Sequence, residues 1–225
     1  MRNLFPARPS HAWGRGVRGQ LGILVGVLLV SALVFAGSSR PGNHLRGQSS
    51  AYLKRAAGQP VDWYPWGAEA FRRARELDRP ILLDVGATWC ATCDRMDRES
   101  YTRPEIAAYI NANFVAVKLD YDARPQLTAK LERAHALKNF PAGIPLTGFI
   151  TPCGKLYLGG TYFPPQAADD RPGFAETLQQ AAELYRNQRA LVQQDGYDLK
   201  LKEELGEEKA HAGAGTRASV ACGQK

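Results

Sequence analysis

The sequence predicts an α/β sandwich, a mixed central β-sheet flanked by helices, which follows an N-terminal apolar segment. Two observations predict this class. Strand-like and helix-like segments alternate through the chain after residue 68, and one short apolar run leads directly into a Cys-x-x-Cys. The 225 residues are 44% hydrophobic and 23% charged. That is an ordinary globular composition with room for one good core.

The central strand is expected at Ile81–Val85, an apolar, partly β-branched run between Pro80 and Gly86. Periodicity predicts the other elements. Helices are expected over 68–77, from 104 to about 111, over 125–138 and from 174 to about 192, and strands over 114–120, 146–151 and 156–159. Together they predict one domain over 50–194, followed by a disordered tail over 195–225.

Segment 52–66 is rich in proline and aromatic residues, which predicts a packed but irregular start to the domain. Its aromatic residues Trp63, Tyr64 and Trp66 are expected to pack in the core rather than contact a substrate.

The N-terminus has the pattern of an export signal. Residues 1–20 contain four arginines and no acidic residue, residues 21–37 are apolar with small residues at the end, and 38–49 form a Gly/Ser/Pro/Arg linker. The long basic region favours an uncleaved membrane anchor over a cleaved signal, and both remain open. Since arginines stay inside, the domain is expected on the extracytoplasmic side, either anchored, or periplasmic or secreted if the leader is cleaved.

The sequence Cys90-Ala91-Thr92-Cys93 stands where the predicted strand passes into a helix. Backbone N–H groups at a helix N-terminus stabilise a thiolate at the first cysteine, and the second, one turn on, is placed to attack a mixed disulfide. A zinc site requires a second pair of ligands, and Cys153, Cys222 and the four histidines lack the spacing of one. Redox chemistry is favoured over zinc or inert thiols, and no metal or cofactor is expected.

This stretch resembles the active site of the thioredoxin superfamily, with Asp84 six residues before Cys90 and Trp89 directly before it. The resemblance implies that Asp84 exchanges a proton with Cys93. It also implies that the Ile144–Pro145 bond is cis and lies across from the cysteines, although most X–Pro bonds are trans. Trp89, Ile144 and Pro145 would then contact an extended substrate chain.

A narrower resemblance is to the thioredoxin-like domain heading the spermatogenesis-associated, YyaL-type proteins. It rests on three motifs in the same order, at 60–67, 143–147 and 159–165. The chain departs from that pattern at Asp84, where those proteins usually have a small polar residue, and between the cysteines, where they have His-Trp. Asp94 replaces a histidine after the second cysteine. The large helical domain of those proteins does not follow in this sequence.

The predicted function is an exported, membrane-tethered thiol–disulfide oxidoreductase that acts on protein thiols and disulfides. Ala91-Thr92 has neither the histidine typical of strong oxidants nor the proline of thioredoxin, and the charge of Asp94 should slightly oppose a nearby thiolate. A reductase or electron relay, fed by a membrane electron donor, is favoured. Two alternatives stay open: a non-catalytic binding or chaperone module, and a copper-handling protein, for which Met96 is the one further ligand in that helix.

The charge does not point to nucleic acid. The net charge is +7, but the arginines concentrate at the N-terminus and no basic stripe with interleaved aromatics follows. Pairing of Cys153 with Cys222 is left open, because a bond to a disordered tail has no defined geometry.

Overall fold

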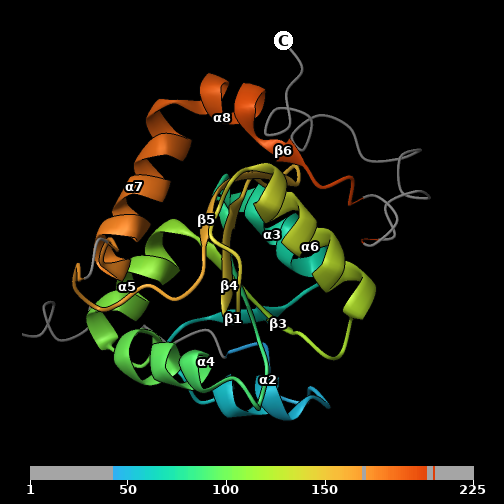
Figure 1. The fold of residues 1–225 in the computed structure, drawn as a ribbon, viewed down its shortest axis with the longest axis vertical. Helices are drawn as coiled ribbons and strands as arrows, with labels where there is room; N and C mark the ends of the chain where they lie inside the picture. The colour runs from blue at the N-terminus through green and yellow to red at the C-terminus, as the bar shows by residue number, and fades with distance from the viewer. Residues whose placement is uncertain (1–42, 169–170, 202–204, 206–225) are drawn as a thin grey trace, which may run out of the picture. The chain divides into compact units, whose positions relative to one another are not determined.

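The computed structural model describes residues 43–168, 171–201 and 205. Within them the strands form one six-stranded sheet in the order β1-β3-β2-β4-β5-β6 (Figure 1). Strands β1, β3 and β2 are parallel to one another, whereas β4, β5 and β6 continue the sheet antiparallel. The mixed sheet is confirmed. The strands are β1 (Trp63–Pro65), β2 (Ile81–Gly86), β3 (Val115–Asp120), β4 (Leu146–Ile150), β5 (Lys155–Gly160) and β6 (Tyr197–Asp198).

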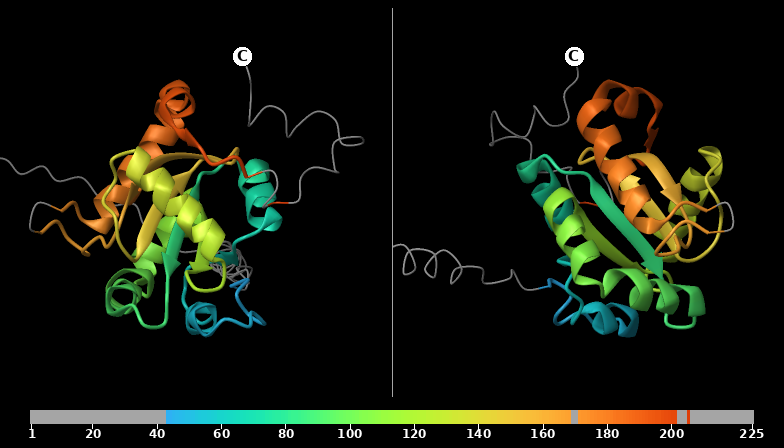
Figure 2. Two further views of the ribbon diagram at one scale, coloured as in Figure 1. Left: turned by 45° about the vertical axis from the view of Figure 1, so that its right-hand side comes forward. Right: turned by 90° about the vertical axis from the view of Figure 1, so that its left-hand side faces the viewer.

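Helices cover both faces of the sheet, as the turned views also show (Figure 2). One face packs against α3 (Ala68–Leu77) and α6 (Pro125–Leu137). The other packs against α2 (Ala51–Ala56), α4 (Ala91–Met96), α5 (Pro104–Asn113) and α7 (Phe174–Asn187). A π-helical turn, Asp97–Tyr101, follows α4, and α8 (Arg189–Asp195) follows α7.

Strand alternation decides which side chains reach the face under α4. Odd-numbered residues of β2 and β3, such as Leu83 and Val117, belong to the core cluster under α3 and α6. Even-numbered residues therefore face α4, and among them Asp84 and Lys118 stand directly opposite each other in the β2–β3 register. An acid and a base thus sit side by side in an otherwise apolar layer.

Several element boundaries differ from the sequence prediction. The opening segment contains two elements that were not expected, α2 and the short strand β1. The last helix is two helices, because the backbone leaves helical geometry at Gln188 between α7 and α8. Trp63, Tyr64 and Trp66 are buried, which confirms that they pack in the core.

The packed unit extends beyond 50–194 at both ends. Leu45, expected in a linker, is fully buried, and the Asn43 side chain donates to the carbonyl oxygens of Ala56 and Val61. After residue 194, β6 pairs with β5, and Leu199 and Leu201 are buried. Apolar side chains at both ends cover core surface that the central elements leave exposed. The prediction of a linker is therefore wrong for the residues around Leu45, and the prediction of a disordered tail is wrong for residues 195–201.

The predicted leader, residues 1–20 and 21–37, lies outside the described residues, as does most of the predicted tail. None of the helices in the described part of the chain has the length and apolar character needed to cross a membrane.

Candidate redox site

Cys90 and Cys93 form a disulfide at the start of α4, with Cα atoms 5.2 Å apart. Cys90 is the N-cap residue of α4, and its sulfur accepts a hydrogen bond of 3.0 Å from the backbone N–H of Cys93. This is the position expected for a thiolate stabilised by helix N–H groups. Ala91 and Thr92 are exposed, while Cys90 is 6% and Cys93 2% exposed, so Cys90 is the sulfur nearer to solvent.

Trp89, directly before the disulfide, is 61% exposed, which is unusual for a tryptophan. Its indole N–H donates to Asp122 Oδ2 at 2.8 Å, and its ring meets the edge of Tyr121. A loop after β3 therefore holds this aromatic surface in place beside the cysteines.

Ile144 and Pro145 lie at the same end of the sheet as the disulfide. Their peptide bond is cis, as the resemblance implied. In the antiparallel register Val85 pairs with Leu146, so Pro145 stands beside the end of β2, where the chain turns towards Cys90. Pro145 is buried and Ile144 half-buried. The five predicted residues outside the strand thus gather at one end of the sheet.

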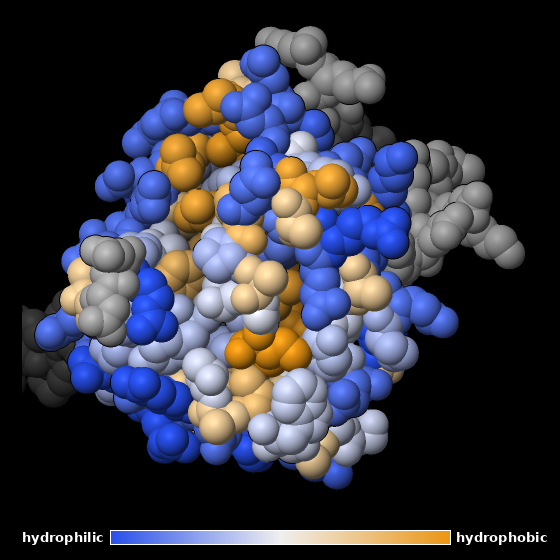
Figure 3. Space-filling model, in the orientation of Figure 1, coloured by the Kyte–Doolittle hydropathy of each residue, from blue (hydrophilic) through white to orange (hydrophobic). Residues whose placement is uncertain are grey.

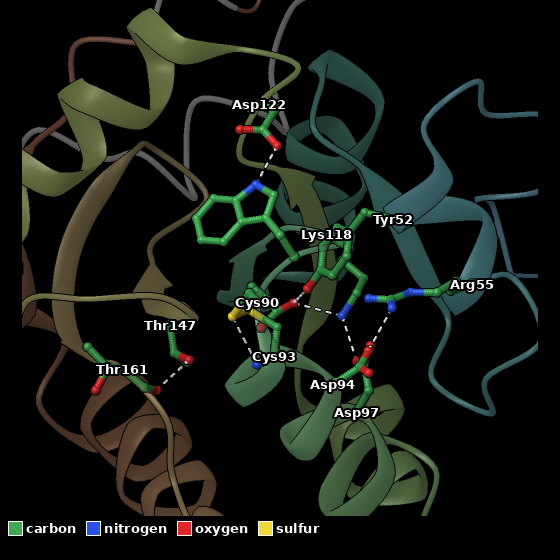
Figure 4. The surroundings of a disulfide bond; sticks show 12 residues. Tyr52, Arg55, Cys90, Cys93, Asp94, Asp97, Lys118, Asp122, Thr147 and Thr161 are labelled. Atoms are coloured by element: carbon green, nitrogen blue, oxygen red, sulfur yellow. Dashed lines mark hydrogen bonds and ion pairs between the residues drawn. A yellow bond between two sulfur atoms is a disulfide. The ribbon is translucent and has the colours of Figure 1, made fainter.

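Asp84 lies deeper in the protein and is 1% exposed. Its Oδ2 is 2.7 Å from the ammonium of Lys118, which is fully buried and also lies 2.9 Å from Asp97 Oδ1 (Figure 4). Two carboxylates therefore share one ammonium. Burial alone would lower the pKa of Lys118, but the charges of Asp84 and Asp97 outweigh it and hold that pKa above its usual range.

Three aromatic rings enclose this ion cluster. The Lys118 nitrogen lies 4.7 to 4.9 Å from the ring centres of Trp63, Tyr101 and Tyr52. Both tyrosines donate to Asp84, Tyr52 to Oδ2 at 2.7 Å and Tyr101 to Oδ1 at 3.3 Å. Burial, reinforced by the charges of Asp84 and Asp97, raises the pKa of both phenols well above the usual value.

A carboxyl group in a buried strand must be neutral or have a partner, and none of the residues around Asp84 was predicted from the sequence. Lys118 had a detectable signal, since it interrupts the apolar residues of the strand predicted over 114–120, which the structure pairs with β2. Asp97, Tyr52 and Tyr101 had none, because their positions depend on how α2 and the π-helical turn pack.

The fold is thioredoxin-like, and its site is a cysteine pair at a helix start with a buried carboxyl behind it. The family model described as Thioredox_DsbH, a protein of unknown function (DUF255), matches residues 42–203. The chain belongs to this family. The predicted membership of the thioredoxin superfamily, of the spermatogenesis-associated and YyaL type, is confirmed.

Spermatogenesis-associated protein 20 of Homo sapiens is 38% identical to the chain over 144 residues, and that of Rattus norvegicus is 37% identical over the same length. Each alignment covers 64% of this chain but 18% of the relative, so the chain spans less than a fifth of those proteins. An uncharacterised protein of Caenorhabditis elegans is 35% identical over 157 residues, 70% of this chain and 22% of that one.

Among solved structures, one described as DsbH oxidoreductase has a TM-score of 0.43 and 19% identity over 55% of this chain and 85% of its own. A putative disulphide-isomerase from Bacteroides thetaiotaomicron has a TM-score of 0.42 and 22% identity, covering 57% of this chain and 96% of its own.

Proposed function

We propose that this protein is a thiol–disulfide oxidoreductase that uses Cys90 and Cys93 on protein substrates. The observation that carries the proposal is the cysteine pair itself. It forms a disulfide at the N-terminus of α4, the exposed Trp89 stands beside it and the buried Asp84 lies behind it. Structural disulfides do not need a buried ionisable cluster, whereas a dithiol that gains and loses protons has a use for one.

In the reductive direction the Cys90 thiolate attacks a substrate disulfide, and one substrate thiolate leaves. Cys93 then attacks the Cys90 sulfur of this mixed disulfide, releases the second substrate thiolate and closes the Cys90–Cys93 bond. Asp84 accepts the proton that Cys93 gives up. The same steps run in reverse oxidise a substrate dithiol.

Trp89, Ile144 and Pro145 are the proposed contacts for the substrate chain. The three residues lie at the same end of the sheet as the disulfide, and a chain lying across them would present its own disulfide to Cys90. The face shown in Figure 3 carries apolar residues in several separate areas, with hydrophilic residues between them. A substrate chain that binds through backbone hydrogen bonds and through contact with the Trp89 ring does not require a continuous apolar surface.

The sequence supports the cellular setting of the proposal. Residues 21–37 would anchor the protein in a membrane, or direct its secretion if cleaved, with the domain outside the cytoplasm. The reductase or electron-relay direction then requires a membrane electron donor, which regenerates the Cys90–Cys93 dithiol.

Reduction of insulin disulfides with dithiothreitol as electron source tests the activity. The wild type should accelerate the reaction, and both Cys90→Ser and Cys93→Ser should lose the acceleration. In a separate incubation, with protein that has been reduced and then freed of dithiothreitol, only Cys93→Ser should accumulate a covalent adduct with insulin, because it keeps the attacking sulfur and lacks the resolving one. A wild type no faster than dithiothreitol alone, with no adduct on Cys93→Ser, would leave a non-catalytic binding module as the better description.

A further inference from the structure

We propose that the Tyr52 hydroxyl carries the proton between Asp84 and Cys93. This inference rests on the proposed function and assigns a role to a residue outside the Cys-x-x-Cys strand–helix unit. Tyr52 comes from α2, near the start of the packed domain, and reaches across to the site with its ring 1% exposed.

The position of the hydroxyl is fixed from two sides. On one side it donates to Asp84 Oδ2 at 2.7 Å. On the other side lies Gly86, whose missing side chain leaves a small space above its Cα. A Cβ placed there would clash with the Tyr52 hydroxyl and lie 2.9 Å from Cys93 Sγ. The hydroxyl and the sulfur therefore approach the same point, and Figure 4 shows Tyr52 pointing from its helix towards the disulfide.

Asp84 itself belongs to a cluster that can hold one additional proton. With both carboxyls ionised, Asp84, Asp97 and Lys118 carry a net charge of −1 in a buried site, and one proton makes the cluster neutral. Asp97 connects this cluster to solvent, since it lines an open pocket together with Arg55, Asp94 and Arg98. The cluster thus has a contact with solvent that is separate from the cysteines.

When the disulfide is reduced, a thiolate attacks Cys90 Sγ, the Cys90–Cys93 bond breaks, and Cys93 leaves with the electron pair. The Tyr52 proton moves to Cys93 Sγ, and the proton of the Asp84 carboxylic acid moves to the Tyr52 oxygen. In the reverse direction Cys93 gives its proton to Tyr52 as it attacks, and Tyr52 gives its own to Asp84. Tyrosine is not left ionised in either direction, which agrees with its raised pKa.

The test compares tyrosine-to-phenylalanine variants that each remove one oxygen. Tyr52→Phe removes the proposed carrier and keeps the ring beside Lys118. Tyr101→Phe removes the other phenol that donates to Asp84. Tyr157→Phe removes a hydroxyl that donates to the Ala181 carbonyl, far along the chain from the site, and controls for the loss of a partly buried tyrosine hydrogen bond. Denaturation midpoints of all three report whether each variant is folded.

The measurement is the rate of disulfide reduction by dithiothreitol from about pH 5 to about pH 9, in water and in deuterium oxide. The thiolate fraction of dithiothreitol changes with pH in the same way for every variant. We therefore compare the ratio of the variant rate to the wild-type rate at each pH, in which this change cancels. Positioned proton transfer is worth about 10²- to 10⁴-fold. Tyr52→Phe should therefore be slower than wild type by at least about 10²-fold at neutral pH, with a changed pH profile and a smaller solvent isotope effect. Tyr101→Phe should be much less impaired, and Tyr157→Phe should match wild type.

A folded Tyr52→Phe variant with the rate, pH profile and isotope effect of Tyr101→Phe would overturn the inference and leave the proposed function intact. A wild-type disulfide that is not reversibly reduced would overturn the proposed function, and the inference with it.

Discussion

At the scale of single residues, the ion cluster around Lys118 is unusual because it places three charged side chains in the buried part of the domain. A fully buried ammonium is costly unless it is paired, and here two carboxylates and three aromatic rings surround it. Such a cluster contributes little net stability compared with apolar packing of the same volume. In the proposed mechanism, its value lies in holding the Asp84 carboxyl against the Tyr52 hydroxyl.

The raised pKa values of this cluster predict that stability falls at alkaline pH. Tyr52 and Tyr101 have folded pKa values above the ordinary 10.0, and Lys118 above 10.5. For groups with a raised folded pKa, the stabilisation is complete below the unfolded pKa and is lost as the pH rises towards the folded one. Urea unfolding above about pH 10 should therefore show a steep loss, to which each group adds about 1.4 kcal/mol per pH unit.

Tyr52→Phe should flatten that slope, because the variant has no phenol to ionise in the unfolded state. If the stability of Tyr52→Phe fell as steeply as that of the wild type between about pH 10 and about pH 11, the raised pKa of the buried Tyr52 phenol would be contradicted.

Only part of this site could be predicted from the sequence. Cys90, Cys93, Trp89 and Asp84 were recognisable because they are close in sequence and their spacing has a chemical meaning. The carboxyl–ammonium pair depends on the strand register, in which Asp84 meets Lys118 across 34 positions of sequence. Tyr52 depends on a short helix that carried no clear periodicity, so no pattern in the sequence pointed to it.

At the scale of elements, the junction between β2 and α4 determines the site. Gly86 ends β2 on the face that carries Asp84, and its lack of a side chain makes room for the Tyr52 hydroxyl and Cys93 Sγ. The prediction of a strand followed by a helix beginning at the cysteines is confirmed at this junction. The π-helical turn after α4, which places Asp97 against Lys118, has no comparable sequence signal.

Gly86→Ala should therefore both destabilise the protein and slow its redox reaction. Overpacking of a buried site costs about 1 to 3 kcal/mol in unfolding free energy. The matched control is Gly58→Ala, where an added methyl group meets nothing within 4 Å, so its stability should stay close to that of the wild type. Equal stabilities and equal reduction rates for the two variants, from urea unfolding and thiol release, would show that the space above Gly86 is not needed.

At the scale of the whole molecule, the alternation of strands and helices was enough to predict the layered α/β fold. It was not enough to find the ends of the packed unit. Segment 43–49 has one apolar side chain among polar residues and glycine. Segment 196–201 alternates apolar Tyr197, Leu199 and Leu201 with polar residues, but it is too short for this pattern to stand out from the polar tail that follows. Both segments pack onto the domain because the sheet and the helices leave apolar surface exposed, which Leu45, Leu199 and Leu201 cover.

Leu199→Ala should accordingly lower the unfolding free energy by about 2 to 5 kcal/mol, the usual range for a buried leucine. Leu191→Ala, in the neighbouring helix α8 at 46% exposure, should change it by less than about 0.5 kcal/mol. Chemical denaturation of the two variants measures the difference. Equal stabilities would mean that the segment after α8 does not belong to the folded unit in solution.

The reduction potential of the Cys90–Cys93 pair tests the central claim most directly. The protein is equilibrated with glutathione redox buffers and its free thiols are trapped and counted. For the proposed reductase we expect a reversible two-electron transition near −270 mV, the range of thioredoxin-type reductants. A value near −120 mV would contradict the proposed direction of electron flow. A pair that shows no reversible transition would contradict the oxidoreductase function itself.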